Sequence, residues 1–358
     1  MSTELNPLGR IVGPLLSWYE KNKRILPWRE EPQPYHVWLS EIMLQQTRVE
    51  AVKPYYSRFL EAIPSIKDLA AAPEEQLLKL WQGLGYYSRV RTMQRAAKIL
   101  HEQYGDCLPG SYDELIRLPG FGEYTAGAVA SIAFGIPVPA VDGNVLRVYS
   151  RVEASYADIG KPEVRKEVTR QIAAIEPREQ AGDFNQSLME LGATVCLPNG
   201  APKCMVCPLN GICEGYRRGV AGELPKKAPK AKRKVEERTI LLLTDGKKIA
   251  LQKRPDSGLL ASMWEFPNLL GFRSQEEIMA LLQQKKAAVL SAEPLKPVKH
   301  IFSHIEWHMK GWLLYIGEIS AMPEFSWVTV KELAEGHALP SAYRAFFKTA
   351  EDILSKSN

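Results

Sequence analysis

The sequence predicts a multidomain protein in which an all-α region is followed by an α+β domain. Three observations lead to this fold class. Apolar residues recur with helical spacing from Leu8 to about Glu190, and prolines interrupt the pattern. Four cysteines lie close together at 196–213. Beyond a basic segment at 219–235, the pattern changes to short runs typical of strands.

Length and composition restrict the class of protein. The chain has 358 residues, 45% of them hydrophobic and 24% charged, and its net charge is +5. Two domains can each bury a core at this length, and the mildly basic balance is compatible with nucleic acid. No apolar run reaches the roughly 18 residues that span a bilayer, and no signal peptide opens the chain. We expect a cytoplasmic monomer that binds no membrane and associates with the nucleoid if the source is bacterial.

The first third of the chain contains a candidate catalytic acid. We expect one helix from Tyr35 to Val49, directly after a proline. On this helix Glu41 has apolar neighbours one turn away, including Trp38 and Leu44. Such surroundings desolvate a carboxyl group and raise its pKa towards that of a general acid at neutral pH. The alternative is that Glu41 lies at the edge of a solvated face.

A glycine hairpin follows in the middle of the chain. The Ser-x-x-Glu at 111–114 fits a capping box for a short helix that runs to Leu118. Gly120 and Gly122 then allow a tight turn in which a phosphate can approach the bare backbone. A second helix through 125–132 presents its first N–H groups to an anion. We interpret this segment as a helix-hairpin-helix DNA-binding element, and an ordinary αα-hairpin is the alternative.

A second acid comes directly after this hairpin. Asp142 lies among small apolar residues in the segment 138–144. Carboxylates on loops beside anion sites are often functional. Together with Glu41, this residue suits a reaction that protonates a leaving group and stabilises a cation.

The four clustered cysteines have a spacing typical of metal ligands. They form a C-x7-C-x2-C-x5-C pattern, whereas Cys107 lies alone. A zinc ribbon requires two C-x2-C pairs, so thiolate ligation of a [4Fe–4S] cluster fits better, with zinc as the alternative. The predicted cluster ligands are Cys196, Cys204, Cys207 and Cys213.

The segment after the cysteines predicts a linker and a second domain. Six cations and no acid occur at 226–234, which indicates a solvated linker or one that also lies along a polyanion. Asp245-Gly246 between two strand-like runs predicts a hairpin. Further strands are expected at 298–302 and 312–319, and helices at 275–284 and 341–354.

Several motifs together resemble the endonuclease III superfamily of DNA glycosylases, and within it the MutY family of adenine DNA glycosylases. The resemblance covers nearly the whole chain, and the motifs are specific only in combination. They are LPWR (26–29), WLSEIMLQQT (38–47), GLGYYSR (83–89), LPGFGEYTAGA (118–128) and VDGNV (141–145), followed by the four cysteines.

The resemblance implies roles for the two acids and their neighbours. Glu41 matches the acid that protonates N7 of a flipped adenine and later helps water to attack. Asp142 matches the carboxylate that stabilises the oxocarbenium ion at C1′, and Asn144 supports it. Tyr124 occupies the position at which bifunctional members carry a lysine that forms a Schiff base. A tyrosine forms no imine, so the resemblance implies a monofunctional glycosylase.

The resemblance also implies DNA-binding residues. Trp28 and Arg29 match residues that line the adenine pocket, and Gln186 can hydrogen-bond adenine. An aromatic side chain beside glycines can replace a lost stacking partner. The residues that match those probing the opposite base and wedging the stack are Gln46, Thr47, Leu84, Gly85 and Tyr86, and the hairpin glycines are Gly120 and Gly122.

The C-terminal part resembles the Nudix hydrolase fold without its catalytic site. Residues 258–267 match only the beginning of the Nudix box, and 273–277 lack the order of its glutamates. In the MutY family this domain reads 8-oxoguanine opposite adenine. Phe302, Ser303 and His304 match the loop that does so, with Ser303 placed to hydrogen-bond the lesion.

The prediction is therefore a base-excision-repair enzyme that binds double-stranded DNA and hydrolytically removes adenine mispaired with 8-oxoguanine or guanine. The predicted parts are a helical glycosylase region at 1–218, with the hairpin at 111–134 and the cluster loop at 196–213, a linker at 219–235 and a Nudix-like domain at 236–358. The first cysteine gap is one residue longer than usual for the family, which affects the position of Cys196. The alternatives are a bifunctional pyrimidine-lesion glycosylase and a non-catalytic lesion-binding protein.

Overall fold

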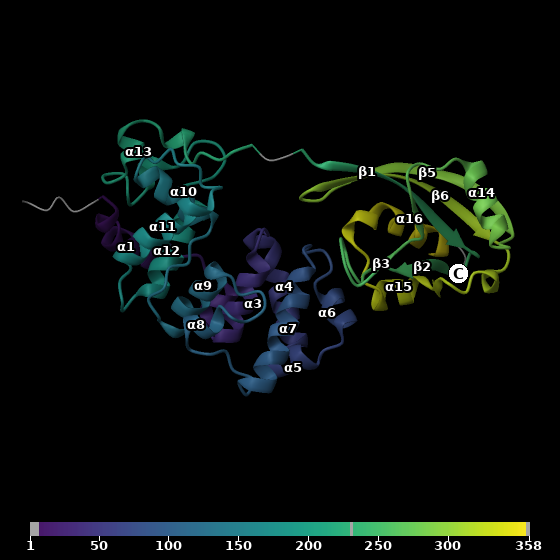
Figure 1. Cartoon of the computed structure of the whole chain (residues 1–358), viewed down its shortest axis with the longest axis horizontal. Coiled ribbons are helices and arrows are strands. Elements are labelled where there is room, and N and C mark those ends of the chain that lie inside the picture. The colour runs from purple at the N-terminus through teal and green to yellow at the C-terminus, as the bar shows by residue number, and fades with distance from the viewer. Residues whose placement is uncertain (1–6, 230–231, 356–358) are drawn as a thin grey trace, which may run out of the picture. The chain divides into compact units, whose positions relative to one another are not determined.

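The computed structural model describes residues 7–229 and 232–355, and its contacts divide them into two units (Figure 1). The first unit comprises 1–71 and 92–229, and the second comprises 72–91 and 230–358. The predicted basic linker includes residues 230 and 231, which lie outside the described residues.

The first unit is helical, as the sequence predicts. Helix α7 (Ser88–Gln103) begins in the second unit and continues into the first. The other elements of the first unit are η1 (Pro7–Arg10), α1 (Val12–Asn22), α2 (Pro27–Glu30), α3 (Pro34–Leu44), α4 (Val49–Ala62), α5 (Ile66–Ala71), α8 (Tyr112–Leu115), α9 (Glu123–Phe134), α10 (Gly143–Val152), α11 (Pro162–Ile175), α12 (Ala181–Thr194), η2 (Cys204–Val206), α13 (Glu214–Arg217) and η3 (Ala221–Glu223).

These helices form two groups that meet at α9 and α12. Helices α1, α10, α11 and α12 share one hydrophobic core, which includes Leu15, Val148 and Phe184. Helix α3 packs against α4 and α9 in the other group, where the rings of Trp38 and Phe121 lie 5.3 Å apart. Helix α12 contacts α9 as well as α10, so it connects the two groups (Figure 1).

Two glycines bring the backbone close to the segment that carries Asp142. A Cβ atom on Gly127 of α9 would lie 2.4 Å from the carbonyl oxygen of Pro139. A Cβ atom on Gly192 of α12 would lie 2.6 Å from Cβ of Asn144. Both approaches are closer than real Cβ contacts allow, so these positions require glycine. The segment before α10 is therefore held between α9 and α12.

Three local predictions were wrong. The helix expected at 35–49 ends at Leu44, and Gln46 then adopts a left-handed backbone with φ of 57°. Helix α8 begins after Ser111, as expected, but among the described residues its side chain makes no capping hydrogen bond with the helix. Helix α8 also ends at Leu115 rather than at 118. By contrast, α9 covers the whole of the predicted second hairpin helix.

The second unit is built on a mixed sheet. The strand order is β3-β2-β1-β6-β5, β4 also pairs with β1, and β7 with β2. Strands β1 and β6 are parallel, and the predicted hairpin at Asp245-Gly246 joins β1 to β2. The elements are α6 (Glu74–Leu80), β1 (Lys234–Thr244), β2 (Ile249–Lys253), β3 (Trp264–Glu265), β4 (Asn268–Leu270), α14 (Gln275–Gln284), β5 (Val289–Ile301), β6 (Ile305–Ile316), η4 (Ile319–Ala321), β7 (Ser326–Val328), α15 (Val330–Gly336), η5 (Ser341–Tyr343) and α16 (Arg344–Ser355).

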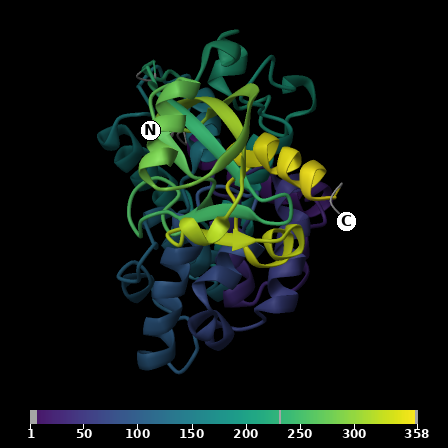
Figure 2. The same ribbon diagram turned by 90° about the vertical axis from the view of Figure 1, so that its right-hand side faces the viewer.

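Alternating residues of β1 enter two different cores. Ile240 and Leu242 pack with residues of α16, whereas Leu241 and Leu243 pack with residues of α14. Side chains alternate between the faces of a strand, so both faces of this sheet are covered. Figure 2 shows the strands between the green helix α14 and the yellow helix α16. This arrangement confirms the predicted α+β domain.

Within the part of the chain that the structure describes, no helix is long and apolar enough to cross a membrane.

Candidate active site

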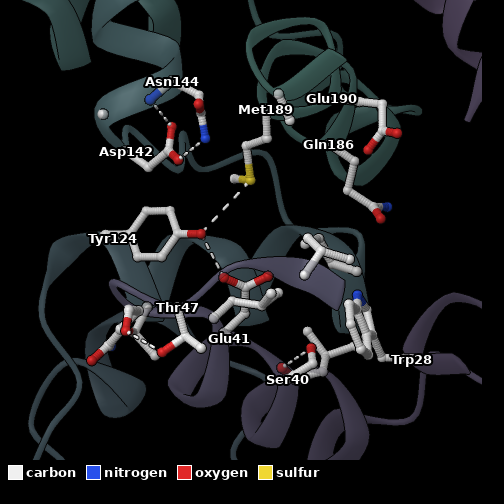
Figure 3. Close-up of a pocket in the computed structure, with 18 of the residues that line it drawn as sticks. Trp28, Ser40, Glu41, Thr47, Tyr124, Asp142, Asn144, Gln186, Met189 and Glu190 are labelled. Carbon is white, nitrogen blue, oxygen red and sulfur yellow. Dashed lines mark hydrogen bonds between the residues drawn. The ribbon is translucent and has the colours of Figure 1, made fainter. Parts of the chain in front are cut away.

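A cavity of about 590 Å³ in the first unit gathers most of the predicted catalytic and base-binding residues. Figure 3 shows Asp142 and Asn144 on one side of it, Glu41 on the other, and the hydroxyl of Tyr124 between them. The predicted residues that line the cavity are Trp28, Arg29, Glu41, Gln46, Thr47, Gly120, Gly122, Tyr124, Asp142, Asn144 and Gln186.

Glu41 is a buried acid, which rules out the alternative that it lies at the edge of a solvated face. Its exposed fraction is 7%, because α3 packs against α9. Burial raises the pKa of Glu41 to about 7, although a hydrogen bond from Tyr124 opposes the shift. The Tyr124 hydroxyl donates this bond to Oε2 over 2.5 Å. With its pKa raised into this range, Glu41 can carry a proton near neutral pH, as a general acid requires.

Asp142 is the residue that precedes α10 and caps it. Its Oδ1 accepts hydrogen bonds from the backbone N–H groups of Asn144 and Val145, each at 2.8 Å. Its Oδ2 accepts one from Nδ2 of Asn144 at 2.7 Å. Burial raises the pKa of Asp142, and these donors together with Arg147 act in the opposite direction. The carboxylate is thus fixed at the positive end of a helix, with one face towards the cavity.

A chain of hydrogen bonds extends from Asp142 to the cysteine loop. Asn144 receives a 2.8 Å hydrogen bond from Arg147, which also donates to the carbonyl oxygen of Cys196 at 2.8 Å. One turn later, Arg151 donates to Sγ of Cys196 at 3.1 Å. These contacts fix the side chain of Asn144 and join the start of α10 to the loop.

The side of the cavity where Arg29 and Gln186 lie contains an ion-pair cluster that sequence reasoning missed. Glu190 is 1% exposed and accepts hydrogen bonds from Arg24 at 2.5 Å and Arg29 at 2.8 Å. Burial alone raises the pKa of Glu190, but these two arginines outweigh it, so the pKa lies below its ordinary value. Arg29 also donates to Oε1 of Gln186 at 3.0 Å.

The sequence carried only a weak signal for Glu190. Leu188, Met189 and Leu191 are its neighbours along the chain, but residues one or two positions apart do not face each other on a helix. The residues one turn away are polar or small, so the argument that identified Glu41 does not apply here. Its one indication was its place one helical turn after Gln186, on the same face of α12.

Of the residues predicted to probe the opposite base, 84–86 belong to the second unit, whereas Gln46 and Thr47 belong to the first. Leu84 is buried, whereas Tyr86 is 43% exposed and has a left-handed φ of 49°. The Tyr86 hydroxyl lies 2.7 Å from Oγ of Ser303, so two residues that are 217 positions apart share a hydrogen bond. Gly85 has a φ of 74°, which favours glycine in this turn.

The loop that carries Ser303 joins β5 to β6. The ring of Phe302 packs edge-on against Trp307, with ring centres 4.9 Å apart. The backbone carbonyl of His304 accepts a hydrogen bond from the N–H of Lys234. Phe302 is thus anchored to the core, and Ser303 is exposed at the tip of the hairpin.

The four clustered cysteines line one small cavity together with Arg151. All four thiols are free, and burial raises the pKa of Cys207 to about 12. Among the described residues, no three His, Cys, Asp or Glu side chains are grouped closely enough to hold a single metal ion.

Comparison with known protein families identifies both units. Residues 39–174 match the HhH-GPD superfamily of base excision DNA repair proteins, and residues 238–349 match the NUDIX domain. Among curated proteins, the adenine DNA glycosylase of Mus musculus is 36% identical, over 94% of this chain and 77% of its own length. That of Buchnera aphidicola (strain Bp) is 35% identical over 86% of both chains.

Solved structures agree with this assignment for the helical part. A thermostable thymine-DNA glycosylase is 27% identical and superposes with a TM-score of 0.53, over 59% of this chain and 97% of its own. A trapped endonuclease III–DNA covalent intermediate is 25% identical, with a TM-score of 0.52, over 60% of this chain and 99% of its own. The predicted helix-hairpin-helix fold is thereby confirmed.

Proposed function

The chain belongs to the adenine DNA glycosylases, which remove adenine from DNA in base excision repair, and on this premise we propose how its residues act and which mispair it repairs. The substrate is adenine opposite 8-oxoguanine or guanine in double-stranded DNA. The enzyme releases the base, leaves an abasic site and does not cut the strand. The observation that carries this proposal is the shared cavity of Glu41, Tyr124 and Asp142.

The two acids divide the reaction between them. Glu41, with a pKa of about 7, gives its proton to N7 of adenine. The electron pair of the C1′–N9 bond then leaves with the base, and positive charge develops on the sugar. The carboxylate of Asp142 stabilises that charge. Glu41, now ionised, takes a proton from the water that adds to C1′, so the net reaction is hydrolysis.

Asn144 and Tyr124 position these acids. Asn144 holds one oxygen of Asp142, and Arg147 fixes Asn144 in turn. Tyr124 donates to Glu41 and thereby sets which of its oxygens carries the proton. Tyr124 cannot form an imine with the abasic sugar, which supports hydrolysis without lyase chemistry.

The flipped adenine occupies the part of the cavity opposite Asp142. Trp28 supplies an apolar wall, held by edge-on packing against Tyr56 with ring centres 5.3 Å apart. Gln186 and Glu190 offer hydrogen-bonding groups for the edge of the base. Arg29 bonds to both side chains and keeps them in place. Such a polar edge distinguishes adenine from bases with another donor pattern.

The hairpin holds the DNA backbone. Gly120 has a φ of 82° and its added Cβ would lie 2.7 Å from Thr92, so the turn requires glycine. The N–H groups at the start of α9 then face a phosphate. Gln46 and Thr47, in the loop after α3, line the active-site cavity together with the hairpin glycines. Endonuclease III, which is similar in fold, has been solved as a complex with DNA.

We further propose that Tyr86 and Ser303 read the opposite base. Tyr86 is exposed and its backbone is fixed in a left-handed turn, which suits an aromatic wedge between bases. Ser303 lies within hydrogen-bonding distance of it, on the tip of a hairpin that Phe302 anchors. A hydroxyl can accept from the N7–H that 8-oxoguanine has and guanine lacks.

The four cysteines fit a [4Fe–4S] cluster. In such a cluster each thiolate binds a different iron, so the sulfurs surround a common space without meeting at one ion. The arrangement around the cavity of Cys196, Cys204, Cys207 and Cys213 has this character. When bound, the cluster would support the loop rather than bind substrate, because its four thiolates leave no ligand position open. Its incorporation is measured by iron and sulfide analysis of the purified protein, and Cys204→Ala is expected to lower both.

We also propose a division of labour along the chain. Residues 1–218 carry out excision, 219–235 connect and 236–358 read the lesion. Residues 72–91 fall within the proposed excision region by sequence, but their contacts place them in the second unit. Those residues include Tyr86, so both proposed reading residues belong to one unit. We expect a monomer to suffice, which sedimentation of the enzyme–DNA complex measures.

A single-turnover assay tests the proposal. A labelled duplex with one adenine opposite 8-oxoguanine is incubated with excess enzyme, and products are resolved with and without alkali. Cleavage that requires alkali is the expected result, and Glu41→Gln abolishes it. The matched control is Glu61→Gln on α4, where the side chain is exposed. Equal cleavage without alkali would mean a lyase, and binding without excision would mean a non-catalytic protein.

A further inference from the structure

A second cavity lies directly beside the active-site cavity in the first unit. Its volume is about 530 Å³. Side chains at its rim, such as Lys23, Gln180 and Asp183, are exposed, so solvent reaches it. The residues that line both cavities are Arg24, Leu26, Trp28, Arg29, Ile132 and Gln186. These six side chains therefore form a wall between the two cavities, which we call the partition.

The partition has fixed parts and one weakly held part. Arg29 is fixed, because it donates to Glu190 and to the carbonyl oxygen of Arg24. Trp28 is buried and packed. The side chain of Gln186 is half-buried, and within the described residues it has one hydrogen bond, the 3.0 Å contact with Arg29. A rotamer change of Gln186 therefore has to break this one hydrogen bond.

After excision, the free base needs a way out of the active-site cavity that the DNA does not cover. With the DNA placed as proposed above, the excised adenine lies between the partition and the abasic nucleotide, and the product DNA covers the side of the cavity where Gly120, Gly122 and Thr47 lie. The base must then wait for the DNA to leave or depart in another direction. A route through the partition frees the base while the enzyme still holds the abasic site.

The second cavity has the chemistry to accept adenine. The base is planar and neutral, with an amino donor and ring-nitrogen acceptors. Tyr19 and Gln180 offer a hydroxyl and an amide, and Asp183 offers a carboxylate acceptor. These groups lie on α1 and at the start of α12, and the apolar side chain of Ile25 is also part of the lining.

We propose that this second cavity is the exit route for free adenine and that Gln186 is the side chain that opens it. The inference rests on the removal of adenine by this family and on the proposed position of the DNA. The base passes from the active-site cavity, past the Gln186 side chain, to the solvent beside Asp183. The abasic DNA remains bound meanwhile.

The test separates release of the base from release of the DNA. A duplex with one tritiated adenine opposite 8-oxoguanine is attached to beads, and excess enzyme is added and washed. Three time courses are recorded: alkali-labile sites on the beads, tritium in solution and enzyme in solution. We expect tritium to follow the chemical step and to precede the enzyme. Tritium that appears only together with the enzyme would overturn the proposal.

A blocking variant gives the second arm. Asp183→Trp, in the first turn of α12, fills the second cavity without touching the first. The matched control is Glu163→Trp, also an exposed acid in the first turn of a 14-residue helix. We expect unchanged excision and about tenfold slower release of tritium for the first variant alone. Equal release of tritium by the two variants would refute the route. If Asp183→Trp does not fold, Gln180→Trp takes its place. Absence of alkali-labile sites in the wild type would instead refute the proposed function.

Discussion

Replacing the buried acid with its neutral isostere is expected to stabilise the protein while it abolishes catalysis. In Glu41→Gln the amide oxygen still accepts the hydrogen bond from Tyr124, but the side chain no longer ionises. The wild-type carboxyl has its pKa raised by burial from 4.5 to about 7. At roughly 1.4 kcal/mol for each pKa unit, this difference corresponds to about 3 kcal/mol of folding free energy.

The sign follows from proton binding. Between pH 4.5 and 7, the folded protein holds a proton on Glu41 that the unfolded chain has lost. Stability of the wild type therefore falls as pH rises through this window, and the loss is complete above pH 7. The Gln variant has no such loss. Its advantage is below about 1 kcal/mol at pH 5 and grows to about 3 kcal/mol at pH 8.

Urea unfolding at pH 5 and pH 8, followed by tryptophan fluorescence, measures this advantage. Wild type, Glu41→Gln and the exposed control Glu61→Gln are compared in the same cluster-loaded state. We expect Glu61→Gln to show the same small difference at both pH values. A Glu41→Gln variant that is less stable than the wild type at pH 8, or equally displaced at both, would show that Glu41 is not a desolvated acid.

Four further outcomes are expected. Tyr124→Phe removes the hydrogen bond that lowers the pKa of Glu41, so the alkaline limb of the single-turnover rate profile moves to higher pH. Asn144→Ala removes a donor from Asp142 and lowers excision about 10- to 100-fold, measured with saturating enzyme. Ser303→Ala weakens the preference for 8-oxoguanine over guanine while excision persists, and an unchanged ratio would contradict its role. Gly127→Ala pushes the Pro139 carbonyl away from α9 and lowers both thermal stability and excision, measured on one sample.

The sequence predicted elements whose signals are local. The hairpin glycines, the strand period and the turn at Asp245-Gly246 each depend on a few adjacent residues, and the structure has them in place. For Glu41 the apolar neighbours one helical turn away left two alternatives, a desolvated acid or the edge of a solvated face, and the structure has it buried. The helical period could not show where α3 ends, since the left-handed Gln46 depends on the packing of the following loop.

Interactions between distant segments were not predictable in the same way. The ion pairs of Glu190 join residues 161 and 166 positions apart, and only folding brings them together. The chain from Asp142 through Arg147 to Cys196 depends likewise on the approach of α10 and α12. Propensity and periodicity describe single elements, and they carry no information about such approaches.

Asp142, at the start of α10, has two tasks: its side chain caps the helix, and in the proposed reaction its charge stabilises a cation. Capping a helix needs only an oxygen that accepts hydrogen bonds from N–H groups, and an asparagine meets that need. Stabilising a cation needs a full negative charge. Replacing Oδ2 by an amino group keeps the cap that Oδ1 provides, but it removes the charge and places two donors, this group and Nδ2 of Asn144, against each other. We therefore expect Asp142→Asn to bind its mispair without excising the base, which makes this position useful for isolating the complex before the bond breaks.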